Sequence, residues 1–179
     1  MKRLLIATSI FLSMTIPSLA AKFSHLKSEI ISISGEINHG DEEQFKALLS
    51  KYPKTRGVVL DSPGGYVDEG LNMALVIHTK KLTTYIVKDA QCVSICSLLF
   101  FSGKHRYISA NGHLGVHTAF DETTRKRDDK TNALIAWYLG YLGYDVGLID
   151  LWLSAEPDSM NTITDKINRD LNLGIEIIN

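Results

Sequence analysis

The stretch Gly57–Gly65, with the sequence GVVLDSPGG, joins an apolar run to a break made of proline and glycine. Its first half is rich in β-branched residues, which predicts a short buried strand. Pro63 and the two glycines end the strand, and apolar residues then recur at helical spacing from Val67 to Lys80. A buried strand that turns tightly into a helix is the unit of an α/β fold with parallel strands.

Strands and helices alternate on both sides of this unit. Expected strands show alternating or β-branched apolar residues, and most of the expected helices show apolar residues three or four positions apart. The strands are expected at Ile30–Ser34, Gly57–Leu60, Thr83–Val87, Arg106–Ile108 and Leu114–His117, and the helices at Asp41–Lys51, Val67–Lys80, Ser94–Phe101, Thr131–Leu142, Val146–Leu153 and Thr164–Leu171. Because strands separated by helices pair in parallel, the sequence predicts a single α/β domain over residues 21–179.

The first 20 residues are expected to form a signal peptide rather than part of this domain. A basic pair at positions 2 and 3 precedes the apolar stretch Leu4–Ile16, which Pro17 ends and small residues follow. This order is typical of a secretory signal peptide cleaved before Ala21, and it predicts a periplasmic or secreted protein. An uncleaved anchor is the alternative, since the charge-free span has borderline length for crossing a bilayer.

The composition excludes several classes of protein. With 19 basic and 20 acidic residues, the chain of 179 residues lacks the basic excess of a nucleic-acid-binding surface. Two cysteines are too few to staple a fold or to build an all-cysteine zinc site. Near His113 and His117 no suitably spaced carboxylate or cysteine completes a ligand set, so we expect no metal and no cofactor.

The glycine turn and a later serine are the first candidate site. The amides of Gly64 and Gly65, close to a helix start, can stabilise developing negative charge, although a plain strand-to-helix turn has the same sequence. Ser94 opens an almost wholly apolar helix. It is either an N-cap or a nucleophile whose reaction centre faces free amides, including that of Ile95. Ser97, one turn later, is the competing hydroxyl.

A histidine is the candidate base. His117 ends an apolar run, where a strand would deliver it to the edge of a cleft. A neutral imidazole there can accept the proton of a serine, because its pKa lies near neutrality. His113 lies on the same face of the expected strand and is the alternative base.

Together, Ser62-Pro63-Gly64-Gly65, Ser94 and His117 resemble the proteolytic subunit of Clp protease and its periplasmic relatives. The resemblance is good from Ile30 to His117 and weaker in the C-terminal third. It implies the Clp/crotonase fold, a spiral of ββα units, here with a C-terminal helical extension. It also implies assembly into trimers, hexamers or larger rings.

The resemblance assigns roles residue by residue. Ser94 matches the nucleophile and His117 the general base, while Gly65 and Ile95 match the residues whose amides form the oxyanion hole. The family places an acid before a Leu-Ser or Leu-Thr pair, which Ile163-Thr164 matches here. Asp158 is the carboxylate that best fits this position, and Asn161, a water or a backbone carbonyl are the alternatives that could orient the imidazole.

Two cysteines flank the serine. Cys92 and Cys96 are four residues apart, so on one helical turn their α-carbons would lie within disulfide reach, at about 6 Å. An oxidising compartment favours this bond, which would pin the segment that carries Ser94. Two buried thiols are the alternative. Together with Val93 and Ile95, these side chains are bulkier than the small residues that the family usually places around its serine.

The resemblance implies a serine peptidase that forms homo-oligomers and hydrolyses peptides or unfolded segments, and the expected signal peptide implies that it is exported. No ATPase partner is expected, since a periplasm lacks ATP and the chain has no phosphate-binding motif. A catalytically inactive peptide-binding or assembly module is the alternative function. Thioester chemistry of the crotonase type is disfavoured, because the sequence has no basic stripe for a nucleotide tail.

Overall fold

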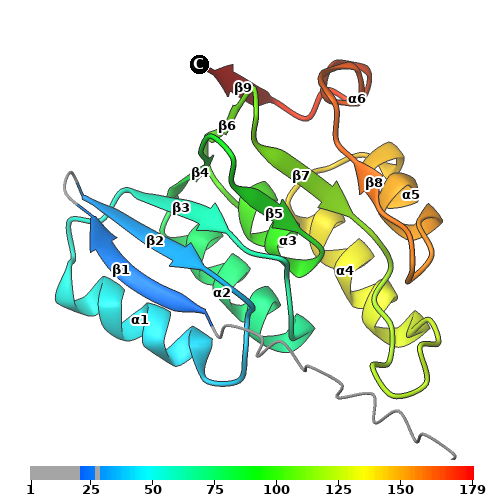
Figure 1. Ribbon diagram of the computed structural model, residues 1–179, viewed down its shortest axis with the longest axis horizontal. Coiled ribbons are helices and arrows are strands. Elements are labelled where there is room, and N and C mark those ends of the chain that lie inside the picture. Colours follow the sequence, from blue (N-terminus) through cyan, green and yellow to red (C-terminus); the bar gives the residue numbers. More distant parts are fainter. Residues whose placement is uncertain (1–20, 27–28) are drawn as a thin grey trace, which may run out of the picture.

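The computed structural model describes residues 21–26 and 29–179, so the expected signal peptide lies outside the described residues (Figure 1). Each expected strand and helix is present. The strands are β1 (Lys22–Leu26), β2 (Ile30–Ser34), β3 (Gly57–Asp61), β4 (Thr83–Ile86), β5 (Gln91–Val93), β6 (Arg106–Ser109), β7 (His113–Val116), β8 (Asn161–Thr162) and β9 (Ile175–Ile178). The helices are α1 (Asp41–Lys51), α2 (Val67–Thr79), α3 (Ile95–Phe101), α4 (Asp129–Tyr141), α5 (Val146–Ser154) and α6 (Asp165–Asp170).

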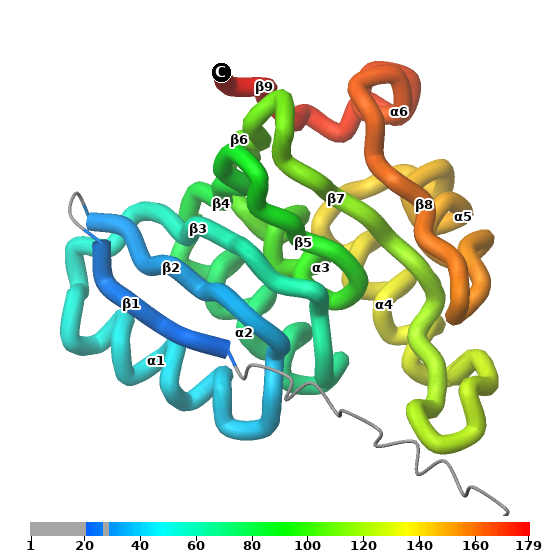
Figure 2. Tube along the Cα trace, in the orientation of Figure 1, coloured from blue at the N-terminus to red at the C-terminus, as the bar shows by residue number. Residues whose placement is uncertain are grey.

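The strands form two sheets. The larger sheet has the order β1-β2-β3-β4-β6-β9, in which β1 is antiparallel to β2 and every other pair is parallel. The smaller sheet has the order β5-β7-β8, with β5 parallel and β8 antiparallel to β7. The predicted α/β class is therefore confirmed. Figure 2 shows the chain advancing from β1 at one end to α5 and α6 at the other, while β9 returns to lie beside β6.

The two sheets meet at the end of β3. The amide of Ser62 donates to the carbonyl of Gln91 at 2.7 Å, and the amide of Val93 donates to the carbonyl of Ser62 at 3.1 Å. Ser62 thus pairs with Cys92, and the backbone that leaves β3 continues beside β5. This junction brings the glycine turn of the larger sheet to the first strand of the smaller one.

The core lies between the strands and helices α1–α4, which follow one another along one side of the strands in Figure 1. Every residue of α3 is buried, as its apolar composition predicts. Phe100 and Trp152 are among the largest fully buried side chains. Within the described ranges, no helix combines the length and apolar character that a membrane span requires.

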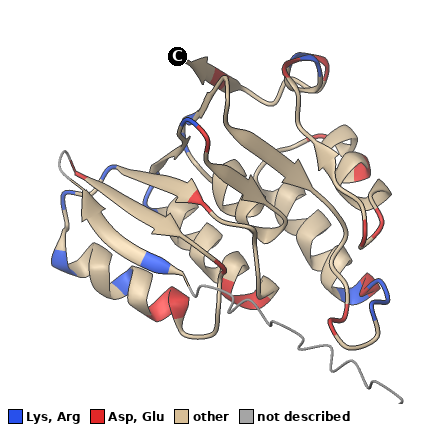
Figure 3. Ribbon diagram, viewed as in Figure 1, with Lys and Arg blue, Asp and Glu red and all other residues tan. Residues whose placement is uncertain are grey.

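The segment between β7 and α4 carries charges of both signs, which Figure 3 shows side by side before α4. The segment is largely exposed to solvent and leads into this helix. Asp128 caps α4 by accepting from the amides of Lys130 and Thr131, each at 3.1 Å. The helix therefore begins two residues earlier than its apolar pattern predicts.

Candidate active site

Ser94 lies at a sharp bend between β5 and α3. Its backbone has φ 57° and ψ −133°, a region that non-glycine residues avoid at a cost of about 1–3 kcal/mol. The Ser94 amide donates to the carbonyl of Gly115 at 3.0 Å, which ties the bend to β7. Ser94 is the N-cap residue of α3, yet its hydroxyl makes no capping hydrogen bond. The hydroxyl is therefore not used to stabilise the helix.

A disulfide brackets this bend. Cys92 and Cys96 are bonded, with their α-carbons 5.2 Å apart and both side chains fully buried. The buried Ser97 hydroxyl lies 3.0 Å from the Cys92 carbonyl and 2.7 Å from that of Gly115. Ser97 thus anchors the backbone around Ser94 and has no access to a substrate.

The glycine turn lies directly against this bend. A β-carbon on Gly64 would lie 2.6 Å from the β-carbon of Ser94. The Ile37 amide donates to the Gly64 carbonyl at 2.7 Å, and the Ile37 carbonyl accepts from Tyr66 at 3.0 Å. Through these two bonds Ile37 pairs in parallel with Gly65, which lies between Gly64 and Tyr66. In such a pairing the amide of Gly65 points away from Ile37.

Two amides are consequently available beside Ser94. Within the described residues, neither the Gly65 amide nor the Ile95 amide donates a hydrogen bond. Ile95 is the first residue of α3, so its amide is one of the helix-terminal donors without an internal partner. Two such donors can stabilise the charge that develops on a carbonyl oxygen under attack.

His117 follows β7 directly, and its backbone neighbour fixes its tautomer. Nδ1 lies 2.8 Å from the carbonyl oxygen of Thr118. Because a carbonyl oxygen only accepts, Nδ1 carries the proton and Nε2 of the neutral ring has a free lone pair. Thr118 is itself held by Ala155, whose carbonyl accepts from the Thr118 amide at 3.0 Å and from its hydroxyl at 2.9 Å.

The environment disfavours the charged form of this imidazole. Burial is the largest influence and lowers the pKa of His117, whereas the hydrogen bond to Thr118 raises it and the nearby Arg125 cation lowers it further. The net direction is downward from the ordinary value. A neutral ring with a free Nε2 is the form that a general base needs.

Ser94, His117 and Gly65 line the same pocket, which has a volume of about 190 Å³. The remaining lining residues are Glu36, Pro63, Val67, Ala119, Phe120 and Glu122. Within the described residues, no hydrogen bond joins the Ser94 hydroxyl to His117. In unliganded enzymes such bonds are often long and tighten only when substrate binds.

The structure does not bring the expected third member to the imidazole. The Asp158 carboxylate is 82% exposed and pairs with the guanidinium of Arg125. The Asn161 side-chain amide donates to the Leu151 carbonyl at 2.6 Å and to the Ser154 hydroxyl at 3.0 Å. The backbone carbonyl of Thr118 occupies the position at Nδ1 that either side chain was expected to fill.

The bulky neighbours of Ser94 do not close the pocket. Ile95 packs against α2, where a β-carbon on Gly70 would lie 2.3 Å from the Ile95 side chain. Val93 and the two cysteines are buried and do not line the pocket. Because their bulk fills the core, the hydroxyl of Ser94 stays accessible from the pocket.

Sequence reasoning missed a residue of α4 that shapes the site. The buried Asn132 accepts from the Ala119 amide at 2.8 Å and donates to the carbonyls of Ala119 at 2.9 Å and Asp128 at 2.8 Å. These bonds hold the backbone that follows His117. An asparagine within an amphipathic helix has no pattern that marks this role, whereas its burial in the fold does.

The alternative residues lie elsewhere. His113 is exposed at the start of β7, opposite Gln91, and does not line the pocket. Among the described residues, no group of three potential ligand side chains could hold a metal ion.

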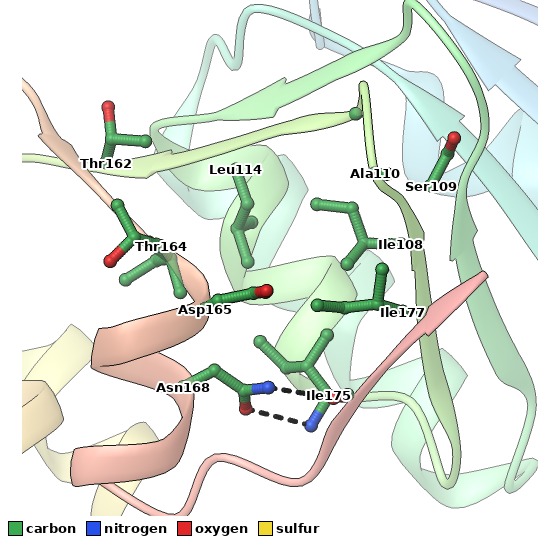
Figure 4. A pocket seen from close by; sticks show the side chains of 12 residues that line it. Ile108, Ser109, Ala110, Leu114, Thr162, Thr164, Asp165, Asn168, Ile175 and Ile177 are labelled. Carbon is green, nitrogen blue, oxygen red and sulfur yellow. Dashed lines mark hydrogen bonds between the residues drawn. The ribbon is translucent and has the colours of Figure 1, made fainter. Parts of the chain in front are cut away.

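A second pocket, of about 280 Å³, lies between β6, β7, β9 and α6 (Figure 4). One polar wall is the side chain of Asn168, which donates to the carbonyl of Ile175 at 2.8 Å and accepts from its amide at 3.1 Å. These two bonds secure β9 against α6. The pocket is lined by neither Ser94 nor His117.

Comparisons with known proteins identify the fold. The Clp protease catalytic domain of Plasmodium falciparum superposes with a TM-score of 0.63 at 19% identity, covering 86% of each chain. A ClpP1 variant from Listeria monocytogenes gives 0.62 at 17% identity, covering 84% of this chain and 91% of the other. A membrane-bound stomatin-specific protease, 1510-N, in complex with a substrate peptide gives 0.62 at 14% identity, covering 83% and 73%.

The chain therefore has the fold of the Clp-type proteases, as the three sequence patches predict. No family model matches the sequence, and no curated protein matches it either. Because identity to these structures is below 20%, the likeness shows the fold alone, and the chemistry has to be argued from the pocket itself.

Proposed function

We propose that the chain is a serine peptidase in which Ser94 is the nucleophile and His117 the general base. The observation that carries the proposal is that one pocket contains Ser94, His117 and Gly65. A Ser94 hydroxyl that makes no capping bond and an imidazole with a free Nε2 support these roles. Substrates are peptides or unfolded segments, and no ATPase is needed.

In the acylation step, Nε2 of His117 takes the proton of the Ser94 hydroxyl as its oxygen attacks a peptide carbonyl carbon. The carbonyl oxygen becomes an oxyanion, which accepts hydrogen bonds from the amides of Gly65 and Ile95. The carbon–nitrogen bond then breaks, and His117 returns the proton to the leaving amine. The Thr118 carbonyl holds Nδ1–H throughout, so Nε2 remains the atom that exchanges the proton.

Deacylation repeats these steps with water. His117 removes a proton from a water molecule, and the resulting hydroxide attacks the ester carbon of the acylated serine. The ester bond breaks, and the proton on Nε2 passes to the Ser94 oxygen. A carbonyl as third member orients the ring without supplying the negative charge of an acid, so turnover is expected to be slower than with a full triad.

The proposal includes export. The disulfide between Cys92 and Cys96 supports it, since such bonds persist in oxidising compartments. The test is the N-terminus of the secreted protein. A mature chain that begins at Ala21 is expected, and a retained Met1 would contradict cleavage.

The proposal also includes self-association. Leu134, Trp137 and Tyr141 on α4 are exposed by 44%, 64% and 56%, and the rings of Trp137 and Tyr141 stack. An apolar face of this kind on a helix that otherwise packs into the core supports contact with further copies of the chain. Sedimentation of the wild-type chain and of Trp137→Glu tests this association. The wild type is expected to sediment as an oligomer and the variant as a smaller species, whereas monomers in both samples would contradict the proposal.

Fluorophosphonate labelling tests the nucleophile. Labelling of the wild-type chain is expected, with loss in Ser94→Ala and strong slowing in His117→Ala. Ser50→Ala is the matched control, because this serine is exposed on α1 and does not line the pocket. Labelling that persists in Ser94→Ala would overturn the assignment.

Cleavage of a mixed peptide library separates this function from the alternative one. Ser94-dependent cleavage supports a peptidase. Peptide binding without any such cleavage would favour a catalytically inactive binding or assembly module.

A further inference from the structure

A continuous set of contacts leads from Asp158 to His117. The Asp158 carboxylate pairs with the guanidinium of Arg125. That guanidinium lies over the ring of Phe120, 4.1 Å from its centroid. The Phe120 ring in turn lies 5.7 Å from the ring of His117, tilted by 31°.

The segment that carries Arg125 is folded on itself, which keeps this cation in place. The backbone amide of Arg125 donates to the Asp121 carbonyl at 2.8 Å, and the Asp121 side chain accepts from the Thr124 amide at 2.7 Å. Phe120 pairs with Arg127 across the loop. Arg125 therefore has two independent restraints, its own turn and the carboxylate of Asp158.

We propose that Arg125, held by Asp158 and seated on Phe120, is a positioning residue that keeps His117 in its neutral, proton-accepting form. Asp158 then acts on the imidazole indirectly, because its carboxylate partly neutralises the charge of Arg125. This inference rests on the proposed function, and it adds a residue for which the sequence patterns give no sign.

The physical basis is electrostatic. A cation beside an imidazole disfavours the imidazolium, in agreement with the lowering effect of Arg125 on the pKa of His117. Among the described residues, the other charged groups that line the pocket of His117 are the carboxylates Glu36 and Glu122, which stay constant across the test variants. Because the Arg125 side chain is 52% exposed, its influence is modest and sensitive to salt.

The two partners of the ion pair are expected to shift the protonation of His117 in opposite directions. Arg125→Met removes the cation and keeps most of the side-chain length, so the acid limb of kcat/KM moves up by about 0.5 pH unit. Asp158→Asn leaves the cation uncompensated, so the limb moves down by about the same amount. Arg125→Lys keeps the charge and is expected to stay close to wild type.

A readout that needs no turnover accompanies the kinetics. The imidazole of His117 is titrated by NMR in a Ser94→Ala background, with and without Arg125→Met or Asp158→Asn. Opposite shifts that shrink in 0.5 M salt support the inference; the Debye length at that concentration is about 4 Å. The matched control is Lys166→Met, which breaks an exposed ion pair to Asp170 on α6 and is expected to leave His117 unchanged.

A purely structural role for the loop predicts that both partner variants lower activity without moving the titration. That result, or shifts in the same direction, would overturn the inference. Expected NMR shifts with no Ser94-dependent cleavage would leave the inference standing and remove the proposed function. Ser94-dependent cleavage with an unchanged titration of His117 would support the proposed function and overturn the inference.

Discussion

Breaking the Cys92–Cys96 disulfide is expected to weaken the whole fold and, separately, the bend at Ser94. The bond closes a loop with a sequence separation of only four residues. The chain-entropy model gives about 2 kcal/mol of stabilisation for so short a loop, which is about 30-fold in the unfolding equilibrium constant.

The local effect follows from the backbone of Ser94. Its positive φ of 57° costs about 1–3 kcal/mol. Without the disulfide, the described restraints on the bend are hydrogen bonds such as that from the Ser94 amide to Gly115, each with a net contribution of about 1 kcal/mol. The strain and the remaining restraints are then comparable, so relaxed conformations become populated. We expect fluorophosphonate labelling to slow by about 5-fold or more, the equivalent of about 1 kcal/mol.

The assay compares oxidised protein with protein that is reduced in denaturant and refolded under reductant. This route is needed because both half-cystines are fully buried. Urea denaturation measures the loss of stability, and the labelling rate measures the bend. A double Cys92→Ala, Cys96→Ala variant is the control, and its stability and labelling rate are expected to be the same with and without reductant. Equal stability and equal labelling rates in the two states would refute the reasoning.

The remaining predictions concern the turn, the base and the loop behind it. Gly65→Ala would put a β-carbon 2.1 Å from the Ile37 carbonyl oxygen, so we expect a loss of about 100-fold in kcat/KM. The control Gly140→Ala, with open space around it in α4, gains about 0.5–1 kcal/mol in urea denaturation, and a turn variant as active as this control would contradict the role of Gly65. Burial lowers the pKa of folded His117, so the unfolded chain takes up the proton first as the pH falls. The free energy of unfolding is therefore expected to be unaffected by His117 above about pH 6.5 and to decline below it. Urea denaturation at several pH values checks this, and an equal decline in His117→Gln would contradict it. Asn132→Ala leaves the backbone of Ala119 without its side-chain partner, so we expect about 2 kcal/mol of destabilisation and a lower kcat; wild-type values for both would show that the loop holds itself.

The sequence predicts those parts of this molecule that depend on local chemistry. The apolar run before Pro63 gives β3, and the uniformly apolar segment after Ser94 gives the buried helix α3. The meeting of Ser94 and His117 in one pocket follows from the spacing that the resemblance supplies. Elements whose periodicity spans several residues are therefore placed correctly.

Of the strands that the sequence did not predict, β1 pairs with the next strand in the chain, β2, whereas β5, β8 and β9 depend on partners that are distant in the sequence. β5 and β8 have three and two residues, too few for any period, and they exist because β7 lies between them. β9 has the composition of a strand, yet its place beside β6 is fixed by a pairing across the whole second half of the chain. Side-chain patterns carry little information on such contacts.

The group that binds Nδ1 of His117 could not be identified from the sequence, because it is a backbone atom. The sequence offers Asp158 as the best-fitting third member and Asn161, a water or a backbone carbonyl as alternatives, and no residue pattern says which carbonyl that would be. The atom that binds Nδ1 is the carbonyl oxygen of Thr118, a group that every residue has. Only the turn after β7, fixed by Ala155 and Asn132, distinguishes this carbonyl from the others.

The junction of the two sheets has a consequence for how such a site can fail. The Gly65 donor belongs to the end of the larger sheet, whereas the Ile95 donor follows a strand of the smaller one. Sliding one sheet past the other would strain the two hydrogen bonds of Ser62 at the junction and misalign the donors, while every ladder within each sheet stayed intact. Loss of oxyanion binding is thus expected to precede measurable unfolding on gentle heating.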